Sequence, residues 1–454
     1  MMRCRYLTRV FWLLLLFTFL SLSISLAFQG ASPLSQILSS LQNYPPPITD
    51  AWDSTSLETL KSQNLSHIPQ GCRSFLFGPW TPTNILSSLP KSVQIHTPNS
   101  DPTVMSQLSL SVPSVISYLH YNEHLSTHRY LCSIESAARH NPNHLIVIHA
   151  KNVTDFEEQL KVWRKGIVRS VEERVKVVEL DYGKYFRETP LWEWYQQGKH
   201  LKSRWVEQNL GNGYRLALLW HKGGAYMDLD IININRLDGL GRMLAKEDSG
   251  KINNAALQFP PKDAFVWDLM EEFVRKFNGM IWANNGPVAV TRTFRATCPA
   301  SSLLLMQSPK NKNNTDPNAP DAPECTNLKI LPSSVFYPIH FLRKGTFTDP
   351  WQKHCKLLGR MQSGSVGLHW WHKLVPDGTR IPREGFLGKV MEVHCPNVVR
   401  DYEGELKEGD GVKEREKEKE KGKMDLGKEP VVIRVPAQRP KVVKVVVKQD
   451  QRKV

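Results

Sequence analysis

The sequence has no charged residue between Arg9 and Asp50, although Lys and Arg together number 59 in its 454 residues. Residues 10–28 within this gap are almost all apolar, and three arginines precede them. As a helix, this run would be about 27 Å long at ~1.5 Å per residue, matching a thin early-secretory bilayer. The positive charge before it places residues 1–9 in the cytosol and the remainder in a lumen. A cleaved signal peptide is the alternative, but the apolar run is long for that role.

The sequence also lacks any basic helix with interleaved aromatic residues, although its formal net charge is +15. Much of the Lys and Arg stands beside acids in the C-terminal tail. We therefore expect no nucleic-acid partner and interpret the positive charge as suited to anionic substrates or membranes. A hydrophobic fraction of 41% excludes global disorder.

Cysteine is scarce, with seven residues in the whole chain. Cys4 falls on the predicted cytosolic side, which leaves an even number of cysteines for an oxidising compartment. Sequence cannot choose among their pairings; only Cys298 and Cys325, which flank a loop rich in Pro and Asn, suggest a local disulfide. Three N-glycosylation sequons fit the same compartment, and they begin at Asn64, Asn152 and Asn313.

The composition of the chain changes near residues 110 and 400. Residues 29–110 are rich in Ser, Pro, Thr and Asn, which is typical of a stem that holds a domain away from a membrane. Residues 401–454 contain a run of alternating charges and a Val/Lys-rich stretch broken by prolines, and we predict that this tail is disordered. The folded domain is therefore predicted over residues 111–400.

Strand and helix patterns alternate from residue 114 onward. Apolar, β-branched runs predict strands, and amphipathic runs predict helices between them. The order implies an α/β fold with a mostly parallel, doubly wound sheet, which binds ligands at the carboxyl ends of its strands. The predicted strands are residues 115–119, 145–148 and 175–180, and the predicted helices are residues 130–139 and 155–163.

Residues 212–230, NGYRLALLWHKGGAYMDLD, contain the strongest candidate site. We predict a helix over residues 214–222 with Asn212 as its N-cap, ended by the two glycines that follow. A buried strand then begins at Ala225, and Asp228 and Asp230 stand where it ends. Two carboxylates at this spacing suit Mg²⁺ or Mn²⁺ that also binds substrate phosphate. An Asp-x-Asp pair alone is frequent by chance and also fits an acidic strand end, so its context carries the prediction.

The run from Gly213 to Leu237 resembles the donor-site signature of the DXD-containing alpha-1,4-glycosyltransferases, the group that includes lactosylceramide 4-alpha-galactosyltransferase. Further blocks that are similar to this family follow in the same order over about residues 115–396. The resemblance implies a GT-A type fold, a UDP-sugar donor and Mn²⁺ or Mg²⁺. The blocks are residues 132–139, 186–191, 277–279, 285–292, 336–338 and 369–373.

The resemblance also implies a role for each matching residue. Asp228 would contact the ribose or the metal, Asp230 would bind the metal that holds the diphosphate, and His369 would complete this metal site. Arg215 and Lys373 would contact the donor. Two alternatives stay open: the histidine could simply pack among the neighbouring tryptophans, and the arginine could form a salt bridge on the helix face.

The sequence departs from the family pattern near the expected reaction centre. Asn212 stands where the family usually has Asp, and Asn285 where it has Gln; both are candidate catalytic residues. Residues 120–122 stand where the family has Glu-Thr-Ser. Because Asn lacks the charge of Asp, the choice of sugar or the rate is open.

The activity implied by the resemblance is transfer of galactose, or a related hexosamine, from a UDP-sugar to a 4-hydroxyl with retention of configuration. The expected acceptor is a galactoside-terminated glycolipid such as lactosylceramide, and a glycoprotein is the alternative. The expected location is the Golgi membrane, as a single-pass type II protein with a lumenal catalytic domain. Two other classes remain: a catalytically impaired glycan-binding protein, and an adhesive protein that acts through its charged tail.

Overall fold

The computed structural model describes most of the region in which we predict the folded domain. Among the residues that it describes, no helix is both long and apolar enough to cross a membrane. The predicted segments 1–9, 10–28 and 401–454, and nearly all of the predicted stem, lie outside these residues. The described residues are 72, 93–94, 112–124, 128–164, 172–248, 250–302, 321–375, 379 and 381–399.

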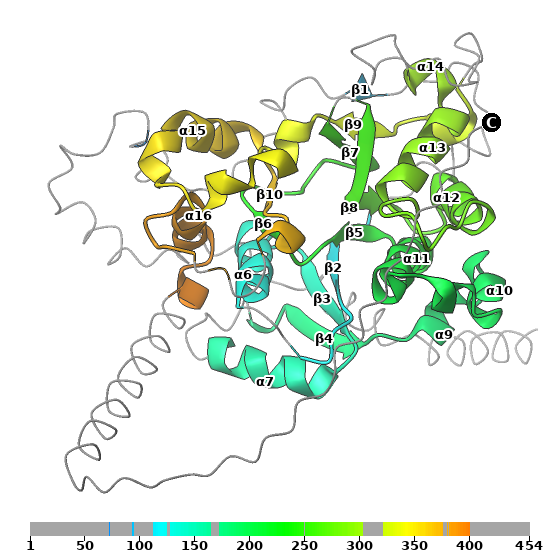
Figure 1. Ribbon diagram of the computed structural model, residues 1–454, viewed down its shortest axis with the longest axis horizontal. Coiled ribbons are helices and arrows are strands. Elements are labelled where there is room, and N and C mark those ends of the chain that lie inside the picture. The colour runs from blue at the N-terminus through cyan, green and yellow to red at the C-terminus, as the bar shows by residue number, and fades with distance from the viewer. Residues whose placement is uncertain are drawn as a thin grey trace, which may run out of the picture. The chain divides into compact units, whose positions relative to one another are not determined.

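A mixed sheet with the strand order β1-β9-β7-β8-β5-β2-β3-β4 forms the centre of the described part (Figure 1). The strands β5, β2, β3 and β4 are parallel neighbours, whereas β8 runs antiparallel to both β5 and β7. The prediction of an α/β fold with a mostly parallel sheet is therefore confirmed, with a mixed second half. In chain order the strands are β1 (Val93–Gln94), β2 (Val115–His120), β3 (Leu145–Ala150), β4 (Val175–Glu179), β5 (Gly224–Met227), β7 (Met243–Asp248), β8 (Lys251–Phe259) and β9 (Lys329–Leu331).

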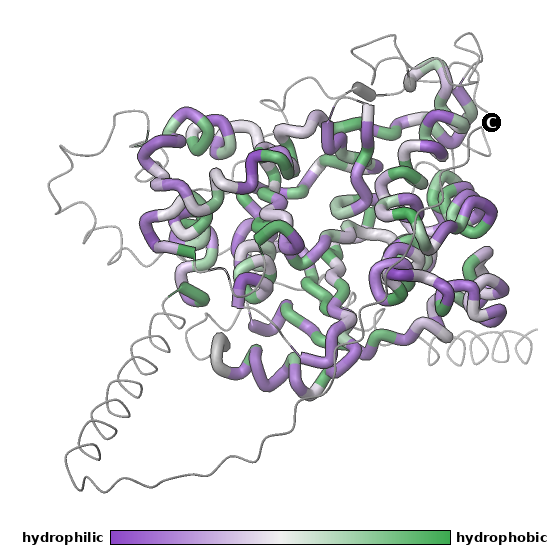
Figure 2. The backbone as a smooth tube through the Cα atoms, in the orientation of Figure 1, coloured by the Kyte–Doolittle hydropathy of each residue, from purple (hydrophilic) through white to green (hydrophobic). Residues whose placement is uncertain are grey.

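Helices cover both faces of this sheet. In Figure 1, α6 and α16 lie on one side, and α11, α12 and α13 lie on the other. The helix α7 contacts β4 at the sheet edge, and its Phe156 and Leu160, one helical turn apart, are buried. Figure 2 shows most of its remaining length as hydrophilic. The main helices are α6 (Arg129–His140), α7 (Val153–Arg164), α9 (Tyr182–Phe186), α10 (Leu191–Gln196), α11 (Val206–Lys222), α12 (Ala264–Arg275), α13 (Pro287–Thr297), α14 (Pro299–Ser302), α15 (Cys355–Gly364) and α16 (Phe386–His394).

The prediction for the helix before the DXD strand was partly wrong. Its C-terminal end at Lys222 is confirmed, but α11 begins at Val206 after Trp205, so Asn212 lies inside the helix and does not cap it. The preceding turns remain helical because they pack closely on the sheet: a Cβ on Gly211 would lie 3.1 Å from Leu119. This close approach offsets the low helix propensity of Gly and Asn.

Three disulfides join distant parts of the chain. Cys298–Cys325 closes the loop between α13 and β9, which confirms the local pairing predicted from the sequence. The other two are Cys72–Cys355 and Cys132–Cys395, so all six cysteines after Cys4 are paired. Cross-links over such long separations restrict the unfolded chain and so stabilise the fold.

Candidate active site

A tight turn after β5 places two aspartates at the carboxyl end of a buried strand. The backbone N–H of Asp228 donates to Ala255 of β8 (2.8 Å), and the N–H of Ile231 donates back to the Asp228 carbonyl (3.1 Å). The Ser133 hydroxyl of α6 donates to the Leu229 carbonyl at the tip of the turn (2.6 Å). These bonds fix the backbone between the two aspartates, so their side chains have defined positions.

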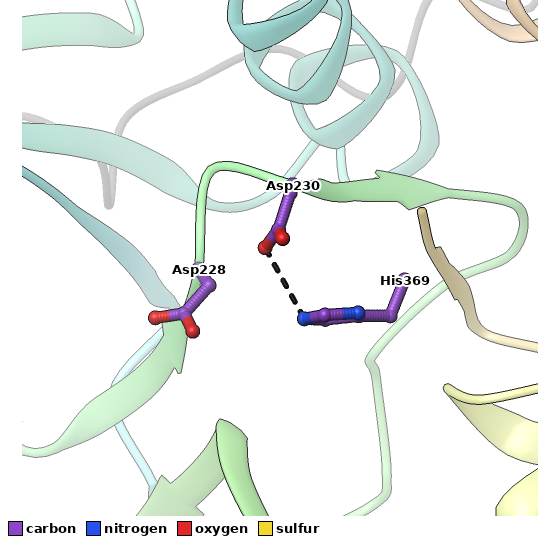
Figure 3. Close-up of side chains that lie close together, drawn as sticks. All are labelled: Asp228, Asp230 and His369. Atoms are coloured by element: carbon purple, nitrogen blue, oxygen red, sulfur yellow. Dashed lines mark ion pairs between the residues drawn. The ribbon is translucent and has the colours of Figure 1, made fainter. Parts of the chain in front are cut away.

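A second, two-stranded sheet brings a histidine to the aspartates. The strand β6 (Ile231–Asn233) continues from the turn and pairs antiparallel with β10 (Gly367–His369), and Ile231 lies opposite His369. Figure 3 shows that the imidazole points toward Asp230, with Asp228 nearby at the end of β5. One candidate ligand atom from each of the three residues lies within 4.8 Å of the others.

Asp230 is held as a carboxylate by its neighbours. His369 Nε2 lies 3.2 Å from Asp230 Oδ1, and the backbone N–H of His372 donates to Oδ2 (2.9 Å). Burial alone would raise the pKa of Asp230, but the facing imidazole and this N–H lower it to about 2. Burial alone would also lower the pKa of His369, but Asp230 raises it above its ordinary value. The two groups therefore form an ion pair in this structure.

Asp228 has different partners. Arg215 Nη1 lies 2.8 Å from Asp228 Oδ1, and the Tyr226 hydroxyl donates to the same oxygen (2.7 Å). Burial raises the pKa of Asp228, and the arginine and the tyrosine hydroxyl oppose this effect. The side chain of Asp228 is 29% exposed and that of Asp230 is 14% exposed, so solvent and ligands can reach both.

The three side chains fit a hard divalent cation. Carboxylate oxygens and an imidazole nitrogen are suitable ligands for Mn²⁺, and Mg²⁺ favours the carboxylates. Asp228 has an oxygen, Oδ2, that the bonds to Arg215 and Tyr226 leave available. One feature differs from most histidine ligands: among the described residues, Nδ1 of His369 has no hydrogen-bond partner, and its ring packs 4.2 Å from the Trp371 ring centroid. His369 thus lies close enough to the aspartates to be a metal ligand and also packs in an aromatic cluster, as the two interpretations expected.

Arg215 links the candidate metal site to the adjacent wall. Besides Asp228, its guanidinium donates to the carbonyl of Asn254 (2.8 Å) and lies 4.5 Å from the Tyr226 ring centroid. The amide of Asn254 in turn donates to Asn212 Oδ1 (2.8 Å). The structure therefore brings Asn212 and Arg215 to one side of Asp228. Both assigned roles for them remain predictions.

The side-chain amide of Asn285 is fully engaged in hydrogen bonds to other residues than the aspartates. Its Oδ1 accepts from the Asn278 N–H (2.9 Å) and the Asn284 amide (2.8 Å), and its Nδ2 donates to Asn209 Oδ1 (3.0 Å) and the Asn278 carbonyl (2.9 Å). An amide with all these bonds shapes the loop before α13 and ties it to α11. In this arrangement it has no spare group for a substrate, so its predicted catalytic role stays a prediction.

Lys373 points toward the same loop. Its Nζ lies 3.8 Å from the Trp282 ring centroid, a cation–π contact, and burial lowers the pKa of Lys373. Among the predicted site residues, the structure thus groups Asp228, Asp230 and His369 most closely and places Arg215 and Asn212 beside them. Lys373 and Asn285 lie at the border of this group.

Three residues that hold the site together did not emerge from the sequence. They are Ser133, Tyr226 and Asn254, which bind the turn, Asp228 and Asn212, respectively. Tyr226 had a detectable signal, because residues two apart on a strand share a face and it stands two before Asp228. Ser133 and Asn254 come from distant segments, so local spacing gives no signal for them.

Two regions of the chain match described protein families. Residues 127–248 match the glycosyltransferase sugar-binding region containing the DXD motif, which includes Asp228 and Asp230. Residues 258–402 match the alpha 1,4-glycosyltransferase conserved region, which includes His369. The chain therefore contains, in succession, both of the conserved regions that these family models describe. The resemblance predicted from its motifs is confirmed.

Relatives within this family cover most of the same domain. The lactosylceramide 4-alpha-galactosyltransferase of Rattus norvegicus is 27% identical over 305 residues, covering 64% of this chain and 76% of that protein. The alpha-1,4-N-acetylglucosaminyltransferase of Homo sapiens is also 27% identical, over 279 residues, covering 60% of this chain and 76% of that protein. This chain is therefore equally similar to two relatives that are named for the transfer of different sugars.

Similar solved structures include two glycosyltransferases. The PaToxG glycosyltransferase is 15% identical with a TM-score of 0.35, covering 45% of this chain and 77% of that one. GlyE of Streptococcus pneumoniae is 9% identical with a TM-score of 0.31, covering 65% of this chain and 64% of that one.

Proposed function

We propose that the chain is a metal-dependent, retaining alpha-1,4-glycosyltransferase with a GT-A type fold. It transfers galactose, or a related hexosamine, from a UDP-sugar to the 4-hydroxyl of a galactoside-terminated glycolipid such as lactosylceramide. The observation that carries the proposal is the convergence of Asp228, Asp230 and His369 at the end of a buried strand, in a chain of this family.

Asp228, Asp230 and His369 would hold a divalent cation, Mn²⁺ or Mg²⁺, which when bound neutralises charge on the departing UDP diphosphate. Arg215 keeps Asp228 oriented and charged through its 2.8 Å contact. The backbone N–H of His372 does the same for Asp230. These fixed contacts preorganise the site, so little rearrangement is needed when the donor enters.

For the retaining step we favour attack of the acceptor on the same face from which the diphosphate leaves. Both acids at the site are engaged: Asp228 with Arg215 and Tyr226, Asp230 with His369. A double displacement needs a carboxylate that can attack the sugar carbon. Mass spectrometry after reaction with a slow fluorinated donor tests this, and a glycosylated enzyme peptide would contradict the front-face route.

Transfer of N-acetylglucosamine or N-acetylgalactosamine, to a glycoprotein or a glycolipid, is the second candidate. A relative named for N-acetylglucosamine transfer is 27% identical, and Asn212 in place of the family's Asp leaves the sugar preference open. The same substitution supports the third candidate, a catalytically impaired glycan-binding protein. These candidates share the fold and differ in turnover, in the sugar transferred and in the acceptor.

We also propose a location in the Golgi membrane. Residues 10–28 would anchor the chain as a single-pass type II protein, residues 29–110 would form the stem, and residues 401–454 would be a disordered tail. Support comes from the arginines before the apolar run and from the three disulfides, which form in oxidising compartments.

The test is an assay of the purified full chain with UDP-galactose, UDP-N-acetylgalactosamine and UDP-N-acetylglucosamine, with lactosylceramide or a soluble β-galactoside as acceptor. We expect Mn²⁺-dependent UDP release that requires an acceptor, and loss of this activity in Asp230→Ala. A matched control is Glu193→Ala, at an exposed acid of α10. Turnover in Asp230→Ala, or its absence in the wild type with every pair, would contradict the proposal.

A further inference from the structure

Exposed apolar side chains gather in one short loop of the described structure. Met280, Ile281 and Trp282, consecutive in the sequence, are 51%, 57% and 51% exposed. Leu201, in the short 3-10 helix η3 (Lys199–Lys202), is 70% exposed. A run of three large exposed apolar residues needs an explanation, because single exposed apolar residues are common but contiguous ones mark interaction sites.

Hydrogen bonds hold the two segments together. The hydroxyl of Ser203, just after η3, donates to the Gly279 carbonyl (3.0 Å), and the N–H of Arg204 donates to the same carbonyl (3.1 Å). A Cβ on Gly279 would lie 2.6 Å from Ser203 Cβ, so only glycine allows this approach. Leu201, Met280, Ile281 and Trp282 therefore belong to one surface, which we call the Trp282 surface.

Basic residues border the Trp282 surface. Lys199, Lys202, Arg204 and Lys276 are all exposed, and none of the four forms an ion pair with another described residue. Arg275 next to them differs, because it pairs with Glu272. The border is thus a set of uncompensated positive charges around apolar side chains.

The Trp282 surface adjoins the candidate active site. Lys373 stands four residues after His369 in the sequence, and its Nζ lies 3.8 Å from the Trp282 ring centroid. Trp282 also packs against Trp205, with ring centroids 5.2 Å apart, and α11 starts at the residue after Trp205. Asn212 lies seven residues along the chain from Trp205, or about 10 Å at ~1.5 Å per residue. The surface is therefore at the edge of the site and not on the opposite face of the domain.

We infer that the Trp282 surface docks onto a lipid bilayer that contains anionic head groups. Apolar side chains ringed by Lys and Arg are typical of interfacial membrane binding, and Trp favours the head-group region. The positive border complements anionic lipid. A protein partner fits less well, because Lys is depleted at protein–protein interfaces.

Docking in this way would hold the edge of the active site at the membrane, where a sugar head group of a lipid acceptor is found. This consequence rests on the proposed function, whereas the docking itself does not. The experiment below therefore measures contact with lipid directly, without depending on turnover.

The test uses the full chain reconstituted into phosphatidylcholine vesicles with 20 mol% phosphatidylserine and a trace of photoactivatable phosphatidylcholine. After illumination, lipid adducts are mapped by peptide mass spectrometry. We expect adducts on residues 280–282 and on Leu201. The internal control is Leu342, which is more exposed at 77% but lies outside the Trp282 surface, and it should carry none.

A charge variant tests the positive border. Each basic residue near an anionic surface contributes about 1 kcal/mol, or roughly fivefold in occupancy, so Lys202→Gln with Lys276→Gln should reduce the docked fraction relative to the undocked roughly 30-fold. The matched control, Lys353→Gln with Lys356→Gln, removes two exposed lysines elsewhere and should leave adducts at 280–282 unchanged.

The outcomes separate docking from catalysis. Adducts at 280–282 that depend on Lys202 and Lys276 support docking even if no sugar is transferred. Adducts that are absent from 280–282, or equal at Leu342, overturn docking even if transfer to a soluble galactoside is normal. If a protein partner or another segment of this chain covers the Trp282 surface, residues 280–282 should carry no lipid adducts.

Discussion

Two Arg–Asp pairs with a buried arginine are built differently in this domain. Arg242 and Asp263 form a bidentate pair, with Nε–Oδ2 at 2.6 Å and Nη2–Oδ1 at 3.0 Å, and their side chains are 4% and 0% exposed. Asp263 also caps α12 by accepting from the Phe265 N–H (3.1 Å). Arg215 and Asp228 share one contact of 2.8 Å, and Asp228 is 29% exposed.

The difference separates a structural pair from a functional one. The guanidinium of Arg242 also donates to the carbonyls of Thr326 and Glu324, so both members are fully used in holding β7, α12 and the Cys325 region together. Asp228 has an oxygen, Oδ2, outside its bonds to Arg215 and Tyr226, and one of its oxygens lies within 4.8 Å of ligand atoms of Asp230 and His369. Changes in the first pair should therefore affect stability, and changes around the second should affect activity.

The largest effect is expected from Asp230→Asn. It keeps the shape of the side chain but removes the charge that would hold a cation, so transfer should fall at least about 10⁴-fold, which is over 5 kcal/mol in activation free energy. The melting temperature should also fall moderately, because the ion pair with His369 is lost. Kinetics with saturating donor and a thermal melt measure both. Normal turnover in Asp230→Asn would contradict the place of Asp230 in the candidate metal site.

Arg242→Met should show the opposite pattern. Removing one partner leaves Asp263 buried and uncompensated, which costs about 3–5 kcal/mol of unfolding free energy. Denaturant unfolding measures this loss, and activity per folded molecule should be unchanged. A stability loss below about 1 kcal/mol would mean that the pair contributes little to the fold.

The effects of Arg215→Met should be intermediate between those of Asp230→Asn and Arg242→Met. Asp228 can be solvated when its partner is lost, so we expect a smaller stability cost than in Arg242→Met. Activity should fall roughly 100-fold, about 2.7 kcal/mol, because the carboxylate loses its fixed orientation. Comparing both variants by unfolding and by kcat/KM tests the distinction. Equal destabilisation by Arg215→Met and Arg242→Met would contradict the distinction between a functional and a structural pair.

Two buried histidines extend the comparison and predict a pH effect. His369 faces a carboxylate, whereas His120 is 3% exposed and its ring packs against Tyr130 and Phe156. Neither imidazole nitrogen of His120 has a hydrogen-bond partner among the described residues. Burial lowers the pKa of His120 to about 4. The unfolded chain therefore takes up a proton near pH 6.5 that the folded chain takes up only near pH 4, so stability is complete above pH 6.5 and falls as the pH falls.

His120→Phe should remove this acid sensitivity. The unfolding free energy of His120→Phe minus that of the wild type should be about 2 kcal/mol larger at pH 5 than at pH 7. Unfolding curves at both pH values measure it, with the exposed His124→Phe as the control. A gain that does not change with pH would show that His120 is protonated equally in both states.

Local sequence patterns predicted much of the fold and part of the site. The strands at residues 115–120, 145–150 and 175–179 follow from apolar runs, and the position of Asp228 and Asp230 at the end of β5 follows from the two glycines before it. The antiparallel β8 could not be predicted in this way, because strand direction depends on tertiary connections. The start of α11 was missed because packing against Leu119 overrides the helix-breaking tendency of Gly211.

The partners of the site residues were the least predictable part. Motif resemblance named His369, but its contact with Asp230 depends on the pairing of β6 with β10 across more than a hundred residues. Asn254 reaches Asn212 only because β8 folds back beside β5. Such contacts depend on the whole topology and leave no periodic signal in the sequence.

Isothermal titration of UDP into the full chain, with and without Mn²⁺, tests the central claim most directly. If Asp228, Asp230 and His369 hold a cation that in turn holds the diphosphate, the wild type should bind UDP only when Mn²⁺ is present. Asp230→Asn should then bind UDP in neither condition. Equal binding of UDP by the wild type and Asp230→Asn, with or without Mn²⁺, would contradict the account.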